Sequence, residues 1–213
     1  MGEAAARELA TSVPLLKAGE VVDGKFRIER TIGTGGMGIV YEATHLKLDQ
    51  RVALKFLPPD AVAKPGVVDR FSHEARAAVK LKSEHVARVL DIGTLDNGAP
   101  FMVMEYLKGS DLAHVVRQRG PLPVHEVADY VLQACEAIAE AHAIGIVHRD
   151  LKPQNLFLTF RVDGRPLVKV LDFGISKFAT SANSGEHMAL TRSQTVLGTP
   201  HYMSPEQVVG EKV

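Results

Sequence analysis

The chain has 213 residues, 46% hydrophobic and 23% charged, which is typical of a globular protein with a sizeable core. Its 25 basic and 25 acidic side chains cancel, which argues against a broad electrostatic attraction to nucleic acid or anionic membranes. The single cysteine, Cys135, excludes an internal disulfide and fits a reducing compartment, and no apolar run approaches the ~20 residues of a membrane span.

Residues 1–22 lack a basic region followed by an apolar core, so we interpret them as a flexible leader and not as a signal peptide. Strands are predicted where apolar residues alternate or where β-branched and aromatic residues gather. These strands are residues 25–32, 39–44, 51–57, 86–93 and 101–106. Residues 67–82 repeat apolar side chains every three or four positions, which predicts a helix. Asp96-Asn97-Gly98 is a strong hairpin signal between the last two strands.

The pattern changes after a connector near Leu107-Lys108-Gly109. We expect a short helix over 110–118 and a longer one over 124–143. The apolar face of the longer helix is expected to be Val127, Val131, Ala134, Ile138 and Ala141. Strands 155–160 and 166–173 flank a second hairpin at Asp163-Gly164, and the small, polar stretch from Ile175 to Val196 is expected to be a mobile loop. The pattern predicts an α+β fold with a five-stranded antiparallel lobe (23–106) and a mainly helical lobe (107–213).

Residues 33–38, Gly-Thr-Gly-Gly-Met-Gly, match the spacing G-x-G-x-x-G. The motif alone is a weak signal, because a dinucleotide-binding turn has the same spacing and then opens a helix. Here Ile39, Val40 and Tyr41 continue as a strand, so the glycines form a hairpin tip whose backbone N–H groups can approach phosphates. A plain glycine-rich turn is the alternative.

Lys55 lies in the otherwise apolar strand that begins Val52-Ala53-Leu54. A buried ammonium is costly without a partner, and Glu74 of the predicted helix 67–82 is a candidate. Such a pair could hold the ammonium toward phosphates. The alternatives are an edge lysine that reaches solvent and a solvated glutamate.

Residues 148–155, His-Arg-Asp-Leu-Lys-Pro-Gln-Asn, are predicted to form a loop, because Pro153 cannot lie inside a helix and disfavours helical angles at Lys152. In this loop Asp150 can accept a hydroxyl proton, and Lys152 can neutralise charge on a phosphate. Asn155 and Asp172 bracket one hairpin, so they start near each other. Two such oxygen ligands suit Mg²⁺, which completes its coordination with phosphate oxygens and water.

Six motifs, taken in chain order, resemble the catalytic core of protein kinases: GTGGMGIV (33–40), VALK (52–55), Glu74, HRDLKPQN (148–155), DFG (172–174) and SPE (204–206). The match runs from about residue 26 to the end. Lys152, and Gly198-Thr199 ahead of SPE, resemble the Ser/Thr class, and the wider sequence is similar to bacterial kinases of the eukaryotic type. The resemblance implies a bilobal fold and transfer of the ATP γ-phosphate to Ser or Thr hydroxyls of proteins, with ATP and Mg²⁺, in the cytoplasm.

The resemblance also implies roles for individual residues. ATP would be bound by Gly33, Thr34, Gly35, Gly36, Met37, Gly38, Val40, Ala53, Lys55, Met104, Glu105 and Leu107. The implied catalytic residues are Asp150 (the base), Lys152, Asn155, Lys55 and Glu74. Mg²⁺ would be held by Asn155 and Asp172, and Thr199 would help to seat the substrate.

Arg149, beside the catalytic Asp150, suggests regulation. An arginine there can pair with a phosphate on the loop that follows DFG, and such charge-assisted pairs order loops. Thr191, Ser193 and Thr195 are the candidate acceptors, and a transient homodimer would allow autophosphorylation in trans. The alternative is that a loop rich in serine and threonine is merely well solvated.

In that family the helical lobe continues for several more helices, so the lobe that ends at Val213 is expected to be incomplete. Two functions from different classes follow. The first is a working Ser/Thr protein kinase, and the second is an inactive fragment that only binds nucleotide or partners. Small-molecule kinases are disfavoured by the sequences LKPQ, DFG and SPE.

Overall fold

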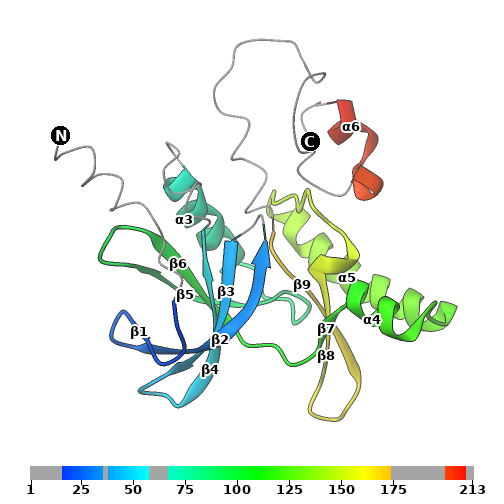
Figure 1. Ribbon diagram of the computed structural model, residues 1–213. Helices are drawn as coiled ribbons and strands as arrows, with labels where there is room; N and C mark the ends of the chain where they lie inside the picture. Colours follow the sequence, from blue (N-terminus) through cyan, green and yellow to red (C-terminus); the bar gives the residue numbers. More distant parts are fainter. Residues whose placement is uncertain (1–15, 36–37, 58–66, 174–199, 210–213) are drawn as a thin grey trace. The chain divides into compact units, whose positions relative to one another are not determined.

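The computed structural model describes residues 16–35, 38–57, 67–173 and 200–209 (Figure 1). They fall into two compact units. Unit 1 comprises the residues up to Lys80 together with Ala87–Leu107, and unit 2 comprises Leu81–Val86 and the residues from Lys108 onward.

Unit 1 is built on an antiparallel sheet with the strand order β1-β2-β3-β4-β6-β5 (Figure 1). Its strands are β1 (Val21–Val22), β2 (Phe26–Gly35), β3 (Gly38–His45), β4 (Gln50–Phe56), β5 (Val89–Thr94) and β6 (Pro100–Glu105). The five predicted strands are confirmed, although β2 continues to Gly35 and β5 begins three residues later than expected. The additional strand β1 pairs with β2 and buries Val22, so this end of the predicted leader is part of the sheet.

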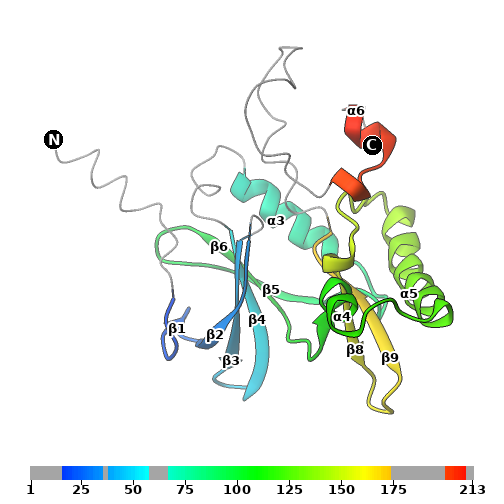
Figure 2. The same ribbon diagram turned by 45° about the vertical axis from the view of Figure 1, so that its right-hand side comes forward.

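Helix α3 (Val67–Ala78) packs against β5 and β6 of the same unit (Figure 2). Phe71 and Ala75 are buried, as expected, but Val79 is 56% exposed, so the predicted helix is too long at its C-terminal end. The chain leaves the helix there because Leu81 belongs to the core of unit 2. The hairpin between β5 and β6 is confirmed, since Gly98 N donates to Leu95 O at 2.8 Å.

Three aromatic rings stabilise the centre of unit 1. Phe56 stacks on Phe101 with 5.4 Å between ring centroids and meets Tyr41 edge to face at 5.6 Å. All three side chains are fully buried. Such ring pairs contribute about 0.5–1.5 kcal/mol of stability beyond the effect of their buried area. They therefore stabilise the pairing of β3 and β4, which carry several of the predicted ATP-binding residues.

Unit 2 combines a three-stranded antiparallel sheet, in the order β7-β8-β9, with helices (Figures 1 and 2). Its elements are β7 (Ser110–Asp111), α4 (Leu112–Arg119), α5 (Val124–Ala143), the 3-10 helix η1 (Pro153–Asn155), β8 (Leu156–Phe160), β9 (Pro166–Val170), the 3-10 helix η3 (Pro200–Tyr202) and α6 (Pro205–Val209). The hairpin predicted at Asp163-Gly164 is confirmed by a bond from Gly164 N to Arg161 O. Helix α4 begins later than predicted, because Asp111 lies in β7 and caps the helix by accepting from His114 N.

The bounds predicted for α5 are confirmed, but its predicted face is only partly correct. The helix buries Tyr130, Ala134, Ala137 and Ala141. Val127 and Val131 are instead 42% and 48% exposed. Small alanines let α5 lie close to β9, whose β-branched Val168 and Val170 are fully buried. Gln133 of the helix also accepts a hydrogen bond from Val168 N, which satisfies a backbone donor of β9.

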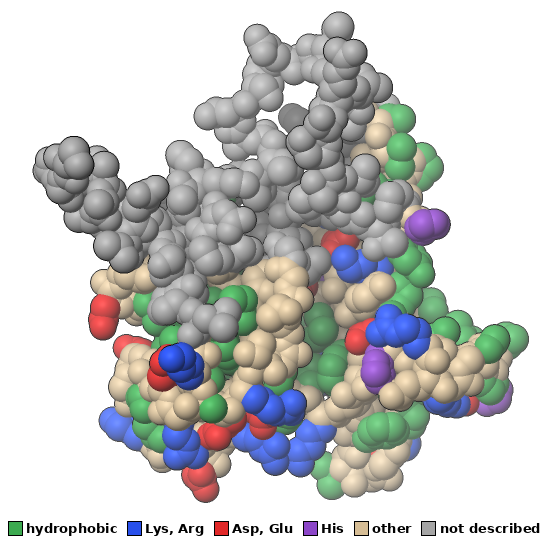
Figure 3. Space-filling model, in the orientation of Figure 1, with side chains coloured by type: hydrophobic (Ala, Val, Ile, Leu, Met, Phe, Trp, Pro, Cys, Tyr) green, Lys and Arg blue, Asp and Glu red, His purple; other side chains and the backbone are tan. Residues whose placement is uncertain are grey.

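The surface in Figure 3 intersperses basic and acidic side chains over the described residues, as the zero formal net charge suggests. Among the described residues, no helix has both the length and the apolar character needed to cross a membrane.

Candidate active site

In unit 1 the glycine-rich segment joins β2 to β3 directly. Gly35 pairs with Gly38, and the strand then continues through Val40, so the helix that a dinucleotide-binding turn would open is not formed. Gly38 has φ +116°, and a Cβ atom on it would collide with the carbonyl oxygen of Phe56 on β4. Only glycine therefore fits at this position. Gly33 and Gly35 have room for a Cβ atom, and Gly36 and Met37 lie outside the described residues.

Lys55 lies on β4 opposite Val40 of β3 and Met102 of β6, and it is only 2% exposed. Ala53 is two positions earlier on the same strand and pairs with Met104, so the two residues share one face of the sheet with Lys55. The burial of Lys55 excludes the alternative of an edge lysine that reaches solvent. Glu74 lies in α3, but its side chain is not among the described ones, so the Lys55–Glu74 pair stays a prediction.

The segment at the end of β6 holds Met104, Glu105 and Leu107, three of the residues predicted to bind ATP. Glu105 is anchored to Arg88, since Glu105 N donates to Arg88 O at 3.0 Å and Arg88 N donates to Glu105 Oε1 at 2.8 Å. These bonds orient the Glu105 peptide before the chain reaches Leu107.

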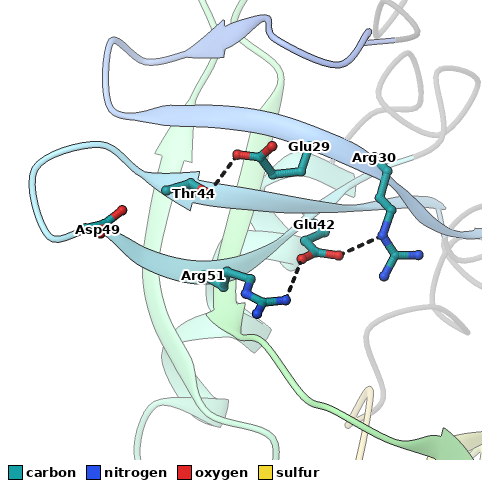
Figure 4. A pocket seen from close by; sticks show the side chains of 6 residues that line it. All are labelled: Glu29, Arg30, Glu42, Thr44, Asp49 and Arg51. Atoms are coloured by element: carbon teal, nitrogen blue, oxygen red, sulfur yellow. Dashed lines mark hydrogen bonds and ion pairs between the residues drawn. The ribbon is translucent and has the colours of Figure 1, made fainter.

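The next residue, Tyr106, contacts two arginines of a charged network, whose charged side chains are drawn in Figure 4. Glu42 of β3 is buried and accepts hydrogen bonds from Arg30 at 2.8 Å and Arg51 at 3.2 Å. Arg30 also donates to the hydroxyl group of Tyr106, and the Arg51 guanidinium lies over the Tyr106 ring, 5.3 Å from its centroid. These arginines line a hollow of about 400 Å³ with Glu42 and other polar side chains. No sequence signal marked Glu42, because its burial depends on arginines from two other strands.

In unit 2 the loop 148–155 gathers three of the predicted catalytic side chains. Lys152 Nζ lies 2.9 Å from Asp150 Oδ2, and the two side chains are only 14% and 6% exposed. Asn155 Nδ2 donates to the Asp150 backbone oxygen at 2.8 Å and to Asp150 Oδ2 at 3.2 Å. Pro153 occupies the first position of η1, where its missing N–H costs nothing. The local sequence therefore builds a nearly buried carboxylate that is held by an ammonium and an amide.

His148 holds the backbone of this loop. Its Nε2 lies 2.8 Å from the carbonyl oxygen of Leu171, and its Nδ1 lies 3.2 Å from Asp150 N. Since the carbonyl can only accept and the amide can only donate, Nε2 carries the proton and the ring is neutral. Burial lowers the pKa of His148, and this outweighs the opposing hydrogen bond to Leu171 and the nearby carboxylates of Asp172 and Asp150. No sequence signal distinguished this histidine from the rest of the loop motif.

Asp172 follows β9 and is tied to the loop through its neighbour, because Leu171 N donates to Asn155 O at 2.9 Å. Both Asp172 and Arg149 have left-handed backbones, with φ of +55° and +60°. Such conformations cost about 1–3 kcal/mol each in non-glycine residues and cluster at functional sites. The predicted residues Thr191, Ser193, Thr195 and Thr199 lie outside the described residues.

Comparisons with known proteins identify the class. The family model described as protein kinase domain matches residues 26–213, so the chain belongs to the protein kinase domain family. Within this family its relatives are bacterial serine/threonine kinases of the eukaryotic type. The α+β fold with an antiparallel first lobe is the protein-kinase fold.

Two curated relatives come from Myxococcus xanthus. The chain is 43% identical over 195 residues to serine/threonine-protein kinase pkn3, covering 92% of this chain and 35% of that protein. It is 42% identical over 190 residues to serine/threonine-protein kinase Pkn1, covering 89% and 26%. The chain thus spans about a third or less of these relatives.

A solved structure with the same fold is the kinase domain of PknI from M. tuberculosis. It has 30% sequence identity and a TM-score of 0.70, and the match covers 93% of this chain and 68% of that chain.

Proposed function

We propose that this chain is the catalytic part of a serine/threonine protein kinase, which transfers the γ-phosphoryl group of ATP to Ser or Thr hydroxyls of protein substrates. The observation that supports this most directly is the Asp150–Lys152–Asn155 cluster, in which a nearly buried carboxylate lies 2.9 Å from an ammonium group. A solvated loop would not bury these charges, because each costs free energy to desolvate.

Unit 1 supplies groups that fit a nucleotide. Gly38 is packed so closely on β4 that a side chain cannot be present, and Gly33 and Gly35 carry none, so the backbone of the hairpin can approach phosphate oxygens. The buried ammonium of Lys55 would hold the α- and β-phosphates, with Glu74 as its partner. The other implied contacts are Thr34, Gly36, Met37, Val40 and Ala53 on the sheet, Met104 as gatekeeper, and the backbones of Glu105 and Leu107.

Unit 2 supplies groups that fit Mg²⁺. The Asn155 amide nitrogen is engaged with Asp150, so its oxygen Oδ1 is the atom that would coordinate the ion together with the Asp172 carboxylate. One carboxylate, one carbonyl-type oxygen, phosphate oxygens and water make a ligand set that Mg²⁺ prefers. When bound, the ion would neutralise negative charge on the phosphates.

The transfer itself needs positioning more than covalent chemistry. The oxygen of the substrate hydroxyl group forms a bond to the γ-phosphorus, and Asp150 Oδ accepts the proton that this hydroxyl group loses. The bond between that phosphorus and the bridging oxygen of ADP breaks, and ADP leaves. Lys152 Nζ donates a hydrogen bond to an oxygen of the phosphoryl group in transit. Removing one such preorganised donor typically lowers kcat about 10²–10³-fold.

The proposal also covers regulation by phosphorylation and the cellular compartment of the reaction. Arg149 would pair with a phosphate on Thr191, Ser193 or Thr195, added in trans within a transient homodimer, and Thr199 would seat the hydroxyl substrate. The reaction would take place in the cytoplasm, where ATP and Mg²⁺ are available.

The test is an assay of the purified chain with labelled ATP, Mg²⁺ and a generic protein acceptor. We expect transfer by the wild type and no transfer by Asp150→Asn. Asp163→Asn changes an exposed hairpin aspartate in the same way and should retain activity. A wild-type chain that binds ATP without transferring phosphate would favour the inactive, nucleotide-binding fragment instead.

A further inference from the structure

Gln207 lies at the start of α6 and closes a hydrogen-bonded cap. Ser204 N donates to Gln207 Oε1 at 3.2 Å, and Gln207 N approaches Ser204 Oγ at 3.4 Å. This reciprocal arrangement is a capping box, in which Ser or Thr is followed three residues later by Glu or Gln. Pro205 occupies the first helical position, where proline is favoured.

The other end of the same amide reaches the catalytic loop. Gln207 Nε2 donates to the carbonyl oxygen of Arg149 at 2.7 Å. The orientation of the amide is determined by its partners, because Ser204 N can only donate and the Arg149 carbonyl can only accept. Both polar atoms of the side chain are therefore used, one within the cap and one toward the loop.

The Arg149 carbonyl belongs to the peptide group that also contains Asp150 N. That N–H group donates to His148 O at 2.9 Å and approaches His148 Nδ1 at 3.2 Å. The peptide unit before Asp150 is thus held at both of its polar ends, by Gln207 and by His148. Arg149 has φ +60°, so this peptide adopts a conformation that is intrinsically unfavourable and needs such support.

We propose that Gln207 is a positioning residue for the kinase reaction: it fixes the Arg149–Asp150 peptide and thereby the direction of the Asp150 carboxylate. The proposal rests on the proposed role of Asp150 as the base. It predicts that glutamine is required at this position. A capping box accepts Glu or Gln, but only the amide can donate to a carbonyl, and a carboxylate there would repel it.

Gln207→Glu separates the two functions of the side chain, because it keeps the capping acceptor and removes the donor. We expect kcat to fall about ten- to a hundredfold with little change in KM for ATP, since a small misplacement of a catalytic group has effects of this size. Gln118→Glu makes the same exchange at an exposed position of α4 and should match the wild type. Gln207→Ala removes both functions. If Gln207→Glu matches the wild type while Gln207→Ala does not, only capping matters and the proposal is wrong.

Hydrogen–deuterium exchange of peptides that span residues 146–156 gives a readout independent of activity. We expect faster exchange in Gln207→Glu than in the wild type or Gln118→Glu, at an unchanged melting temperature. Faster exchange with an inactive wild type would support the contact and contradict the proposed function. Unchanged exchange would overturn the positioning role, whatever the activity.

Discussion

Lys152 Nζ lies 2.9 Å from Asp150 Oδ2 in a site where both side chains are nearly buried. The positive charge of Lys152 offsets the negative charge of Asp150 before any substrate binds. Lys152→Met removes the cation, so the buried carboxylate loses its ion-pair partner, while the Asn155 hydrogen bond remains, and the phosphoryl group loses a donor. We expect the single-turnover rate to fall about 10²–10³-fold, with a smaller change in ATP affinity. Lys47→Met, in the exposed turn after β3, is the control, and a Lys152→Met enzyme that retains its rate would contradict the assigned role.

Gly38 and Gly35 are neighbours in the β2–β3 register but face different constraints. Gly38 has φ +116°, and a Cβ atom on it would collide with the carbonyl oxygen of Phe56. A Cβ atom on Gly35 would have no atom within 4 Å beyond its chain neighbours. We expect Gly38→Ala to reduce the free energy of unfolding by about 2–4 kcal/mol and Gly35→Ala to change it by less than about 0.5 kcal/mol. Urea unfolding of both variants makes the comparison, and equal losses would show that the close approach to Phe56 is not limiting.

His148 links stability to pH. Burial lowers its pKa below the ordinary value of 6.5, so below that pH the unfolded chain takes up a proton that the native chain resists. The stability that neutral His148 provides is therefore present above 6.5 and is lost as the pH falls toward the lowered value. Protonation of Nδ1 would also break the bond from Asp150 N.

We expect the unfolding free energy of the wild type to fall as the pH drops below about 6.5, and His148→Phe to show a shallower slope. Unfolding in urea at several pH values measures both slopes. His142→Phe, at an exposed position near the end of α5, should keep the wild-type slope. A wild-type slope in His148→Phe would assign the acid sensitivity to other groups.

Glu42 is bonded to Arg30 and Arg51, and through them to Tyr106. Because both arginine side chains are more than half exposed, solvent screening limits what the ion pairs contribute. We expect Glu42→Gln to cost about 1 kcal/mol of unfolding free energy and Glu29→Gln, at a more exposed site on β2, to cost less. A double-mutant cycle with Arg30→Met checks the coupling, and a coupling energy near zero would mean that Glu42 is held by packing alone.

Much of the fold followed from the sequence because its signals are local. Alternating apolar residues, together with β-branched and aromatic residues, predicted the strands of unit 1, and the bounds of α5 matched the expected 124–143. Pro153 predicted a loop over 148–155, which the structure forms with only the short 3-10 helix η1 at its end. Polar residues of that loop are the ones that the structure brings together at Asp150. Chemistry encoded within a few consecutive residues needs little tertiary context.

The tertiary structure decided which partner each side chain meets. The sequence predicted that Val127 and Val131 belong to the buried face of α5, but both are largely exposed. The helix instead packs against β9 through its alanines, because small side chains allow closer packing. No sequence signal marked Glu42, which the structure buries beside two arginines from the neighbouring strands. The capping box of Ser204 and Gln207 is local, but the hydrogen bond from Gln207 to Arg149 joins residues 58 positions apart in the sequence. Periodicity and turn chemistry act over a few residues and can be read from the sequence, whereas burial and hydrogen-bond partners depend on segments that meet only after the chain has folded.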